Sequence, residues 1–280
     1  MKYNINNRRI MGKYLKKFDT TSQYNAYTAD TANFIKPNVS LITETNTVEY
    51  NPYVPETMVV AKYNVTDTSS PTPIGFNQYT SGFSAIEIDG VKQPSVVSAY
   101  TFNTTGEHTV KYTLADPTSI GMEAFAGCDS LTSIDIPSGV TSIGDYAFVN
   151  CTRFTSIDIP NGVTTIGSGV FQGCTSLTSC TIGSGVTSIG TQAFIGCSSL
   201  TSVTIGSGVT SIGDYAFNNC TNLTSIVSNA TTAPTIQNST FNGVKANGTL
   251  TVPSGSTGYD VWMGTGNFYL GKYNWTKVEQ

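Results

Sequence analysis

A phenylalanine and a cysteine recur together at a fixed interval of 23 residues through the middle of the chain. The cysteine follows the phenylalanine by three residues each time, giving Phe125 and Cys128, Phe148 and Cys151, Phe171 and Cys174, Phe194 and Cys197, and Phe217 and Cys220. A repeat of this length predicts a solenoid, in which each repeat is one coil stacked on the next. Free cysteine behaves as a small buried hydrophobe, so we predict that these ten side chains form the solenoid core.

Within one coil, the order of residues predicts two short strands joined by turns. Residues 131–136 alternate apolar and polar side chains, as a strand with one buried face does. Residues 137–139, Pro-Ser-Gly, suit a turn because proline presets φ and glycine accepts a positive φ. Residues 140–143 then predict a second strand. Residues 146–151 predict a short helical turn that inserts an aromatic ring and a thiol into the core.

The coil resembles the BspA-type leucine-rich repeat, whose consensus runs close to IPxxVTSIGxxAFxxCxxLTS. The match covers residues 118–228 and holds in five successive coils. The resemblance implies a mainly β fold: a right-handed solenoid of 23-residue coils with short strands and a short helical turn, preceded by small β modules. It also implies a binding surface rather than an enzyme, because such repeats occur in bacterial surface adhesins and in phage proteins.

Composition and pattern divide the chain into five predicted segments. Residues 116–245 form the solenoid, and the aromatic-rich residues 246–280 cap its last coil. Residues 81–115 alternate as strands around an Asp-Gly turn, so they predict a small β module on the first coil. Residues 55–80 hold three prolines among Ser, Thr and Gly and predict a linker, which leaves residues 1–54 as an N-terminal module. For the tail aromatics, a platform that stacks sugar rings is the alternative to a cap.

The N-terminal module begins with a basic arm, since residues 1–17 hold six basic residues and no acidic one. The sequences KYLKKFDT, PNVS and VEYNP within residues 13–54 resemble the N-terminal module of structural proteins from phages of gut Bacteroidales, including crAss-like phages. The resemblance implies a piece for virion attachment or assembly. The residues assigned to it are Arg8, Arg9, Lys13, Tyr14, Lys16, Lys17 and Phe18. A solvated arm and an ordinary β-hairpin domain are the alternatives.

Few side chains suit catalysis or metal binding. The single histidine, His108, lies in a predicted β segment, away from any cysteine or carboxylate cluster. The cysteines lack the CxxC spacing of zinc sites, and Cys180, outside the ladder, takes a buried strand position. We therefore predict no catalytic residue, no metal and no cofactor. Neighbouring coils bring ladder cysteines near bridging distance, so disulfides remain an open alternative.

The outward positions of the first strand are the candidate binding residues. They form a serine row and a second row of aspartate and threonine: Ser133, Asp135, Ser156, Asp158, Ser179, Thr181, Ser202 and Thr204. A calcium site or an acid–base pair of aspartates is disfavoured, because the two threonines interrupt the carboxylate row. Hydroxyls with few charges suit hydrogen bonds to a glycan or contact with another subunit, and an inert surface is the third alternative.

Charge and hydropathy limit the partners. The net charge is −4, and residues 116–228 carry one basic and seven acidic residues, so we expect no nucleic-acid partner. No apolar run approaches the roughly 20 residues that span a bilayer, so we expect no membrane partner. Residues 2–9 are polar where a secretion leader has an apolar core, and we expect the secretion route to be unused.

These features together predict a non-enzymatic phage virion protein: a head fibre, decoration or tail component made in the host cytoplasm. We expect a homo-oligomer whose N-terminal module contacts other virion proteins and whose repeats bind a glycan or protein of the host surface. The alternative is a leucine-rich-repeat adhesin on a bacterial cell surface.

Overall fold

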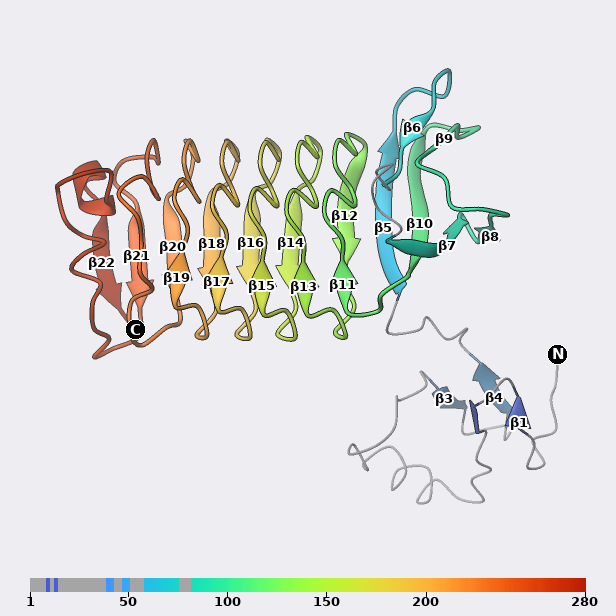
Figure 1. Ribbon diagram of the computed structural model, residues 1–280, viewed down its shortest axis with the longest axis horizontal. Helices are drawn as coiled ribbons and strands as arrows, with labels where there is room; N and C mark the ends of the chain where they lie inside the picture. The colour runs from blue at the N-terminus through green and yellow to red at the C-terminus, as the bar shows by residue number, and fades with distance from the viewer. Residues whose placement is uncertain (1–8, 11–12, 15–38, 43–46, 51–57, 76–81) are drawn as a thin grey trace. The chain divides into compact units, whose positions relative to one another are not determined.

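The repeats fold into a solenoid of stacked coils, each with two short strands (Figure 1). The computed structural model describes residues 58–75 and 82–280, together with four short strands nearer the N-terminus. The chain divides into two compact units, residues 1–55 and 56–280. In the first unit, two antiparallel pairs form: β1 (Arg9–Ile10) with β2 (Lys13–Tyr14), and β3 (Val39–Ile42) with β4 (Thr47–Tyr50). The side chains predicted to attach the protein to a virion lie outside the described residues.

From the second coil on, the first strand of each coil joins one long parallel sheet. Its members are β14 (Ser156–Ile159), β16 (Ser179–Ile182), β18 (Ser202–Ile205), β20 (Ser225–Ser228), β21 (Thr249–Val252) and β22 (Thr276–Glu279). The second strands form a parallel sheet of β11 (Ser119–Ile120), β13 (Ser142–Ile143), β15 (Thr165–Ile166), β17 (Ser188–Ile189) and β19 (Ser211–Ile212). The predicted mainly β solenoid is therefore confirmed.

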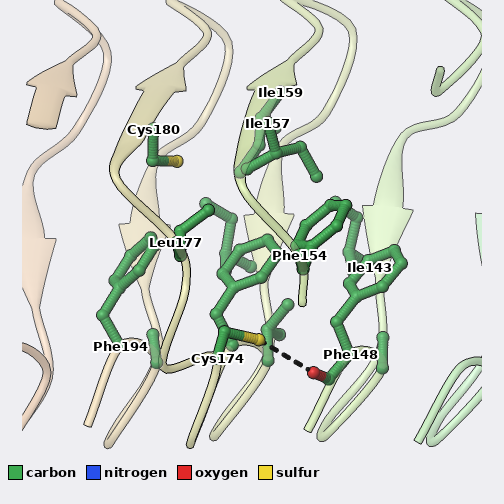
Figure 2. Close-up of a cluster of buried hydrophobic side chains, with 14 of the residues drawn as sticks. Ile143, Phe148, Phe154, Ile157, Ile159, Cys174, Leu177, Cys180 and Phe194 are labelled. Atoms are coloured by element: carbon green, nitrogen blue, oxygen red, sulfur yellow. Dashed lines mark hydrogen bonds between the residues drawn. The ribbon is translucent and has the colours of Figure 1, made fainter. Parts of the chain in front are cut away.

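The phenylalanine ladder is a continuous stack of rings between the two sheets. Successive ring centroids from Phe125 to Phe217 lie 5.1–5.5 Å apart, and Phe241 extends the stack by one more ring at 5.8 Å. Figure 2 shows Phe148 and Phe194 of this ladder, with Phe154 beside Phe148. All ten ladder side chains are buried, so stacking buries what one coil alone would expose.

The ladder cysteines are free thiols with a defined hydrogen-bonding role. Four of the five ladder thiols donate to the carbonyl of a phenylalanine one coil earlier, as Cys174 Sγ does to Phe148 O at 3.1 Å (Figure 2). The same contact recurs at 3.0–3.2 Å for Cys151, Cys197 and Cys220. The same four carbonyls also accept the N–H of the cysteine in their own coil, at 3.1–3.3 Å, so the thiol is a second, weak donor to an acceptor with two lone pairs.

The segment predicted as a helical turn, residues 146–151, forms turns instead. The N–H groups of Tyr146, Phe148 and Asn150 donate to carbonyls of the next coil, while the intervening N–H groups donate three residues back within their own coil. Tyr146 and Asn150 also have positive φ, at 56° and 58°. Half of the N–H groups are thus used between coils, and no helix forms here. Among the described residues the one helix is the 3₁₀ turn η1 (Leu270–Tyr273).

An antiparallel sheet covers the first coil. The first-coil strand β12 (Leu131–Asp135) pairs with β5 (Met58–Val65), and the sheet continues through β10 (Gly106–Leu114), β7 (Phe83–Ile88) and β8 (Val91–Lys92). A smaller pair, β6 (Thr72–Pro73) with β9 (Ala99–Tyr100), lies beside it. The aromatic stack also continues into this sheet, since Tyr112 and Phe83 lie 5.2 and 5.5 Å from Phe125.

The predicted linker over residues 55–80 differs from the structure, because residues 58–65 are strand β5, which lies between β12 and β10 in the covering sheet. Its side chains alternate between buried and exposed, with Val59, Ala61 and Tyr63 inside. Of the three prolines that suggested a linker, Pro71 lies in the loop after β5 and Pro73 lies in β6, while Pro55 lies outside the described residues. Arg153, the one basic residue between residues 116 and 228, ties this region to the solenoid by donating to Asn64 O and Thr66 Oγ1 at 3.3 and 3.4 Å.

The C-terminal aromatic residues close the last coil. Tyr259, Trp262 and Trp275 are buried, and each donates its polar hydrogen to a backbone carbonyl at 2.8–2.9 Å. Trp262 also lies 5.3 Å from Phe241, at the end of the ring stack. These three rings are therefore inaccessible to a sugar, while Phe268 is exposed beneath the Lys272 ammonium.

Candidate binding face

The outward positions of the long sheet line up in two columns because the strands pair without register shifts. The first column contains only hydroxyls: Ser156, Ser179, Ser202, Ser225, Thr249 and Thr276. The second is mixed: Asp158, Thr181, Thr204, Val227, Thr251 and Val278. Strand neighbours are about 4.8 Å apart, so the first column is a regular line of hydroxyl groups.

Six of the eight predicted binding residues lie together on this face, on β14, β16 and β18. The other two, Ser133 and Asp135, lie on β12, opposite Lys62 and Val60 of the covering sheet. These two residues therefore lie where the first coil meets the covering antiparallel sheet, outside the long parallel sheet.

A second set of hydroxyls, which the sequence reasoning missed, donates its hydrogen bonds within the fold. Beside the long sheet, Thr155, Thr178 and Thr201 each donate from Oγ1 to the carbonyl of the threonine one coil earlier, at 2.9–3.1 Å. An equivalent ladder beside the second sheet spans Thr141, Thr164, Thr187, Thr210 and Thr235 at 3.0–3.3 Å. The signal was present as threonine at 23-residue spacing.

The serine column differs from these ladders. The hydroxyls of Ser156, Ser179, Ser202 and Ser225 make no hydrogen bond within the described part of the chain. All four are exposed or half-buried. Each hydroxyl can donate one hydrogen bond and accept two, so the column offers a ligand a row of uncommitted donors and acceptors.

The remaining candidate groups do not form a reactive centre. His108 is buried with Nδ1 2.7 Å from Asp89 Oδ2 and Nε2 2.9 Å from Thr104 O, and so it ties together two loops of the covering sheet. Burial raises the pKa of the Cys174 thiol to about 12 and raises the pKa of the other five thiols. At neutral pH these thiols are protonated, and a protonated thiol is a poor nucleophile.

The described residues hold neither a metal-binding cluster nor a membrane-spanning helix. No three His, Cys, Asp or Glu side chains there gather closely enough to hold a metal ion. In the same residues, no helix has the length and apolar character needed to cross a membrane.

Comparison with known proteins identifies the repeats. The sequence pattern of the BspA type Leucine rich repeat region matches in six copies over residues 95–257, more than half of the chain. None of the curated proteins compared with the chain matches it.

Several solved leucine-rich repeat structures are similar to the chain. A T. pallidum leucine-rich repeat protein is 34% identical over 39% of this chain and 51% of its own, with a TM-score of 0.39. A leucine-rich repeat protein from Bacteroides ovatus is 31% identical over 67% of this chain and 49% of its own, with a TM-score of 0.42. A leucine rich cell surface protein from Faecalibacterium prausnitzii is 26% identical over 49% and 52%, with a TM-score of 0.35. The chain spans about half the length of each.

Proposed function

The chain belongs to the BspA-type leucine-rich repeat family, and we propose that it is a non-enzymatic binding protein whose outer strand face holds a glycan of a host surface. The observation that carries the proposal is the division between two sets of hydroxyls. The threonine ladders are committed to backbone carbonyls, whereas the serine column keeps its donors and acceptors for a partner.

The chemistry of the face favours a glycan over a charged partner. Residues 116–228 hold one basic and seven acidic residues, so phosphate-rich ligands are repelled. A line of hydroxyls that both donate and accept matches the hydroxyls of a sugar chain, which also do both. A protein of the host surface is the second possible occupant, and the experiment below separates the two.

A glycan array tests the proposal with the full chain as probe. We expect binding to a set of related glycans, and its loss in Ser202→Arg, because the long side chain covers the hydroxyl column. Ser188→Arg is the matched control, since Ser188 is a half-buried serine of the neighbouring coil on the second sheet. Absence of any glycan binding, or equal loss in both variants, would contradict a glycan-binding face.

Whether the protein resides on a virion or on a cell surface is a separate question, and our proposal for it rests on the sequence resemblance of residues 13–54. We propose a virion component that assembles through residues 1–54, with the bacterial cell surface as the alternative. Light scattering on the full chain and on residues 56–280, a compact unit of its own, tests the assembly role. An oligomer that becomes a monomer on truncation supports it, and two monomers would contradict it.

A further inference from the structure

A shallow hollow lies on the binding face, beside the ends of β14, β16 and β18. Its volume is about 460 Å³, within the range of roughly 300–1,000 Å³ typical of small-ligand sites. The residues that line it are Ile159, Pro160, Asn161, Thr181, Ile182, Gly183, Ser184, Thr204, Gly206, Ser207 and Asn229. None of these side chains is charged.

The hollow exists because the repeat changes at one position. The first turn residue is proline in two coils, Pro137 and Pro160, and then glycine in the next two, Gly183 and Gly206. A Cβ on Gly183 would lie 2.6 Å from Pro160 O, and one on Gly206 would lie 2.3 Å from Gly183 O. The backbones of these coils therefore approach too closely for a side chain at this position. As a result, no side chain fills the surface between Pro160 and Asn229, and this surface forms the bottom of the hollow.

A second change falls on the same two coils. The outward column carries aspartate at Asp135 and Asp158 but threonine at Thr181 and Thr204, both of which line the hollow. The carboxylates therefore stop at the edge of the hollow, which leaves its interior neutral. The two changes are at different positions of the repeat, and together they give one neutral, open depression in an otherwise regular face.

Polar groups converge on the hollow from two sides. Asn161 Oδ1 accepts hydrogen bonds from the N–H and the hydroxyl of Ser184, at 2.9 and 3.2 Å, which fixes the amide and leaves its NH₂ group for a ligand. Thr181 and Thr204 present their hydroxyls from the strands. The ring of Pro160 supplies an apolar wall beside these groups.

We propose that this hollow seats one neutral sugar unit of the glycan, an inference that rests on the proposed function. The ring's apolar face lies against Pro160, and its hydroxyls bond the Asn161 amide and the two threonines. The serine column then contacts the units on either side. A neutral sugar fits better than an acidic one, because Asp158 stands beside Thr181 at the rim.

The experiment places tryptophan in the hollow and at a matched position outside it. Thr204 and Thr251 occupy the same half-exposed outward column on β18 and β21, and only Thr204 lines the hollow. Thr204→Trp, Thr251→Trp and the unaltered full chain are compared on an array of neutral, sialylated and sulfated glycans. Circular dichroism melting checks that both variants are folded.

We expect neutral glycans to bind the unaltered chain, with affinity about tenfold lower or worse in Thr204→Trp and little changed in Thr251→Trp. An equal loss of glycan affinity in both variants would be consistent with a glycan-binding face but would contradict a sugar bound in the hollow. Unchanged binding in Thr204→Trp, or binding of acidic glycans only, would also overturn the seat. If no glycan binds the unaltered chain, the proposed function itself fails.

Discussion

The inner and outer faces of the same strands repeat with different fidelity. The middle inward position is always apolar and buried: Ile134, Ile157, Cys180, Val203 and Ile226. The neighbouring outward position runs from charged to polar to apolar: Asp135, Asp158, Thr181, Thr204 and Val227. Stacking holds the inner face constant, because each coil buries its core only against the next. The outer face has no such constraint, so we propose that its variation sets the binding specificity.

The largest expected effect comes from breaking the inner face. Phe171→Ala should lower the free energy of unfolding by about 3–5 kcal/mol, because it leaves a cavity in the middle of the ring stack. Ser179→Ala, on the outer face of the same coil, should change it by less than about 0.5 kcal/mol. Urea denaturation followed by circular dichroism measures both. Comparable losses would mean that the two faces do not differ in their contribution to stability.

The buried thiols predict a loss of stability at high pH. The pKa of Cys174 rises from 9.0 to about 12 on folding, mainly through burial. Below pH 9 the thiol is neutral in both states and its contribution is intact. Above it, the unfolded thiol ionises while the folded one does not, so stability falls until about pH 12. For this thiol the slope approaches about 1.4 kcal/mol per pH unit.

Urea denaturation at pH 8 and pH 10 measures this loss in the unaltered chain and in Cys174→Ala. The variant starts less stable, because it lacks buried volume, but its stability should fall less between the two pH values. An identical fall in both proteins would contradict the assignment to this thiol.

A smaller effect is expected from the threonine ladder. Thr178→Val keeps the shape of the side chain but removes its hydrogen bond to Thr155 O, for a loss of about 0.5–1.5 kcal/mol. The loss is limited because the Thr178 N–H still donates to the same carbonyl at 2.8 Å. Thr181→Val on the open face is the control and should leave the urea midpoint unchanged. A stabilised Thr178→Val would show that the ladder is not a source of stability.

The sequence alone predicted the buried positions that repeat. The 23-residue repeat predicted the buried phenylalanine ladder and the inward position of Cys180, because a core position recurs in every coil. Asp89 and Gly90 were predicted as a hairpin turn, and both have positive φ between β7 and β8. Such short-range signals depend on a few residues and survive without knowledge of the rest of the fold.

The features that depend on distant partners were harder to predict. Residues 58–65 form a strand because β10 and β12 pair with it from both sides, and neither partner is near it in sequence. The turn at 146–151 is not helical because its N–H groups bond to the next coil. The hollow at Gly183 and Gly206 was visible as a change from proline to glycine, but its depth depends on how closely adjacent coils pack.

One paired measurement tests the central claim, that ladder hydroxyls hold the fold while column hydroxyls hold the ligand. Two triple variants are compared, one with Ser156, Ser179 and Ser202 changed to alanine and one with Thr155, Thr178 and Thr201 changed to valine. Melting temperature and glycan-array binding are recorded for both. We predict that the serine variant melts like the unaltered chain and loses glycan binding, while the threonine variant melts lower and still binds. A serine variant that melts lower, or that binds as well as the unaltered chain, would contradict the account.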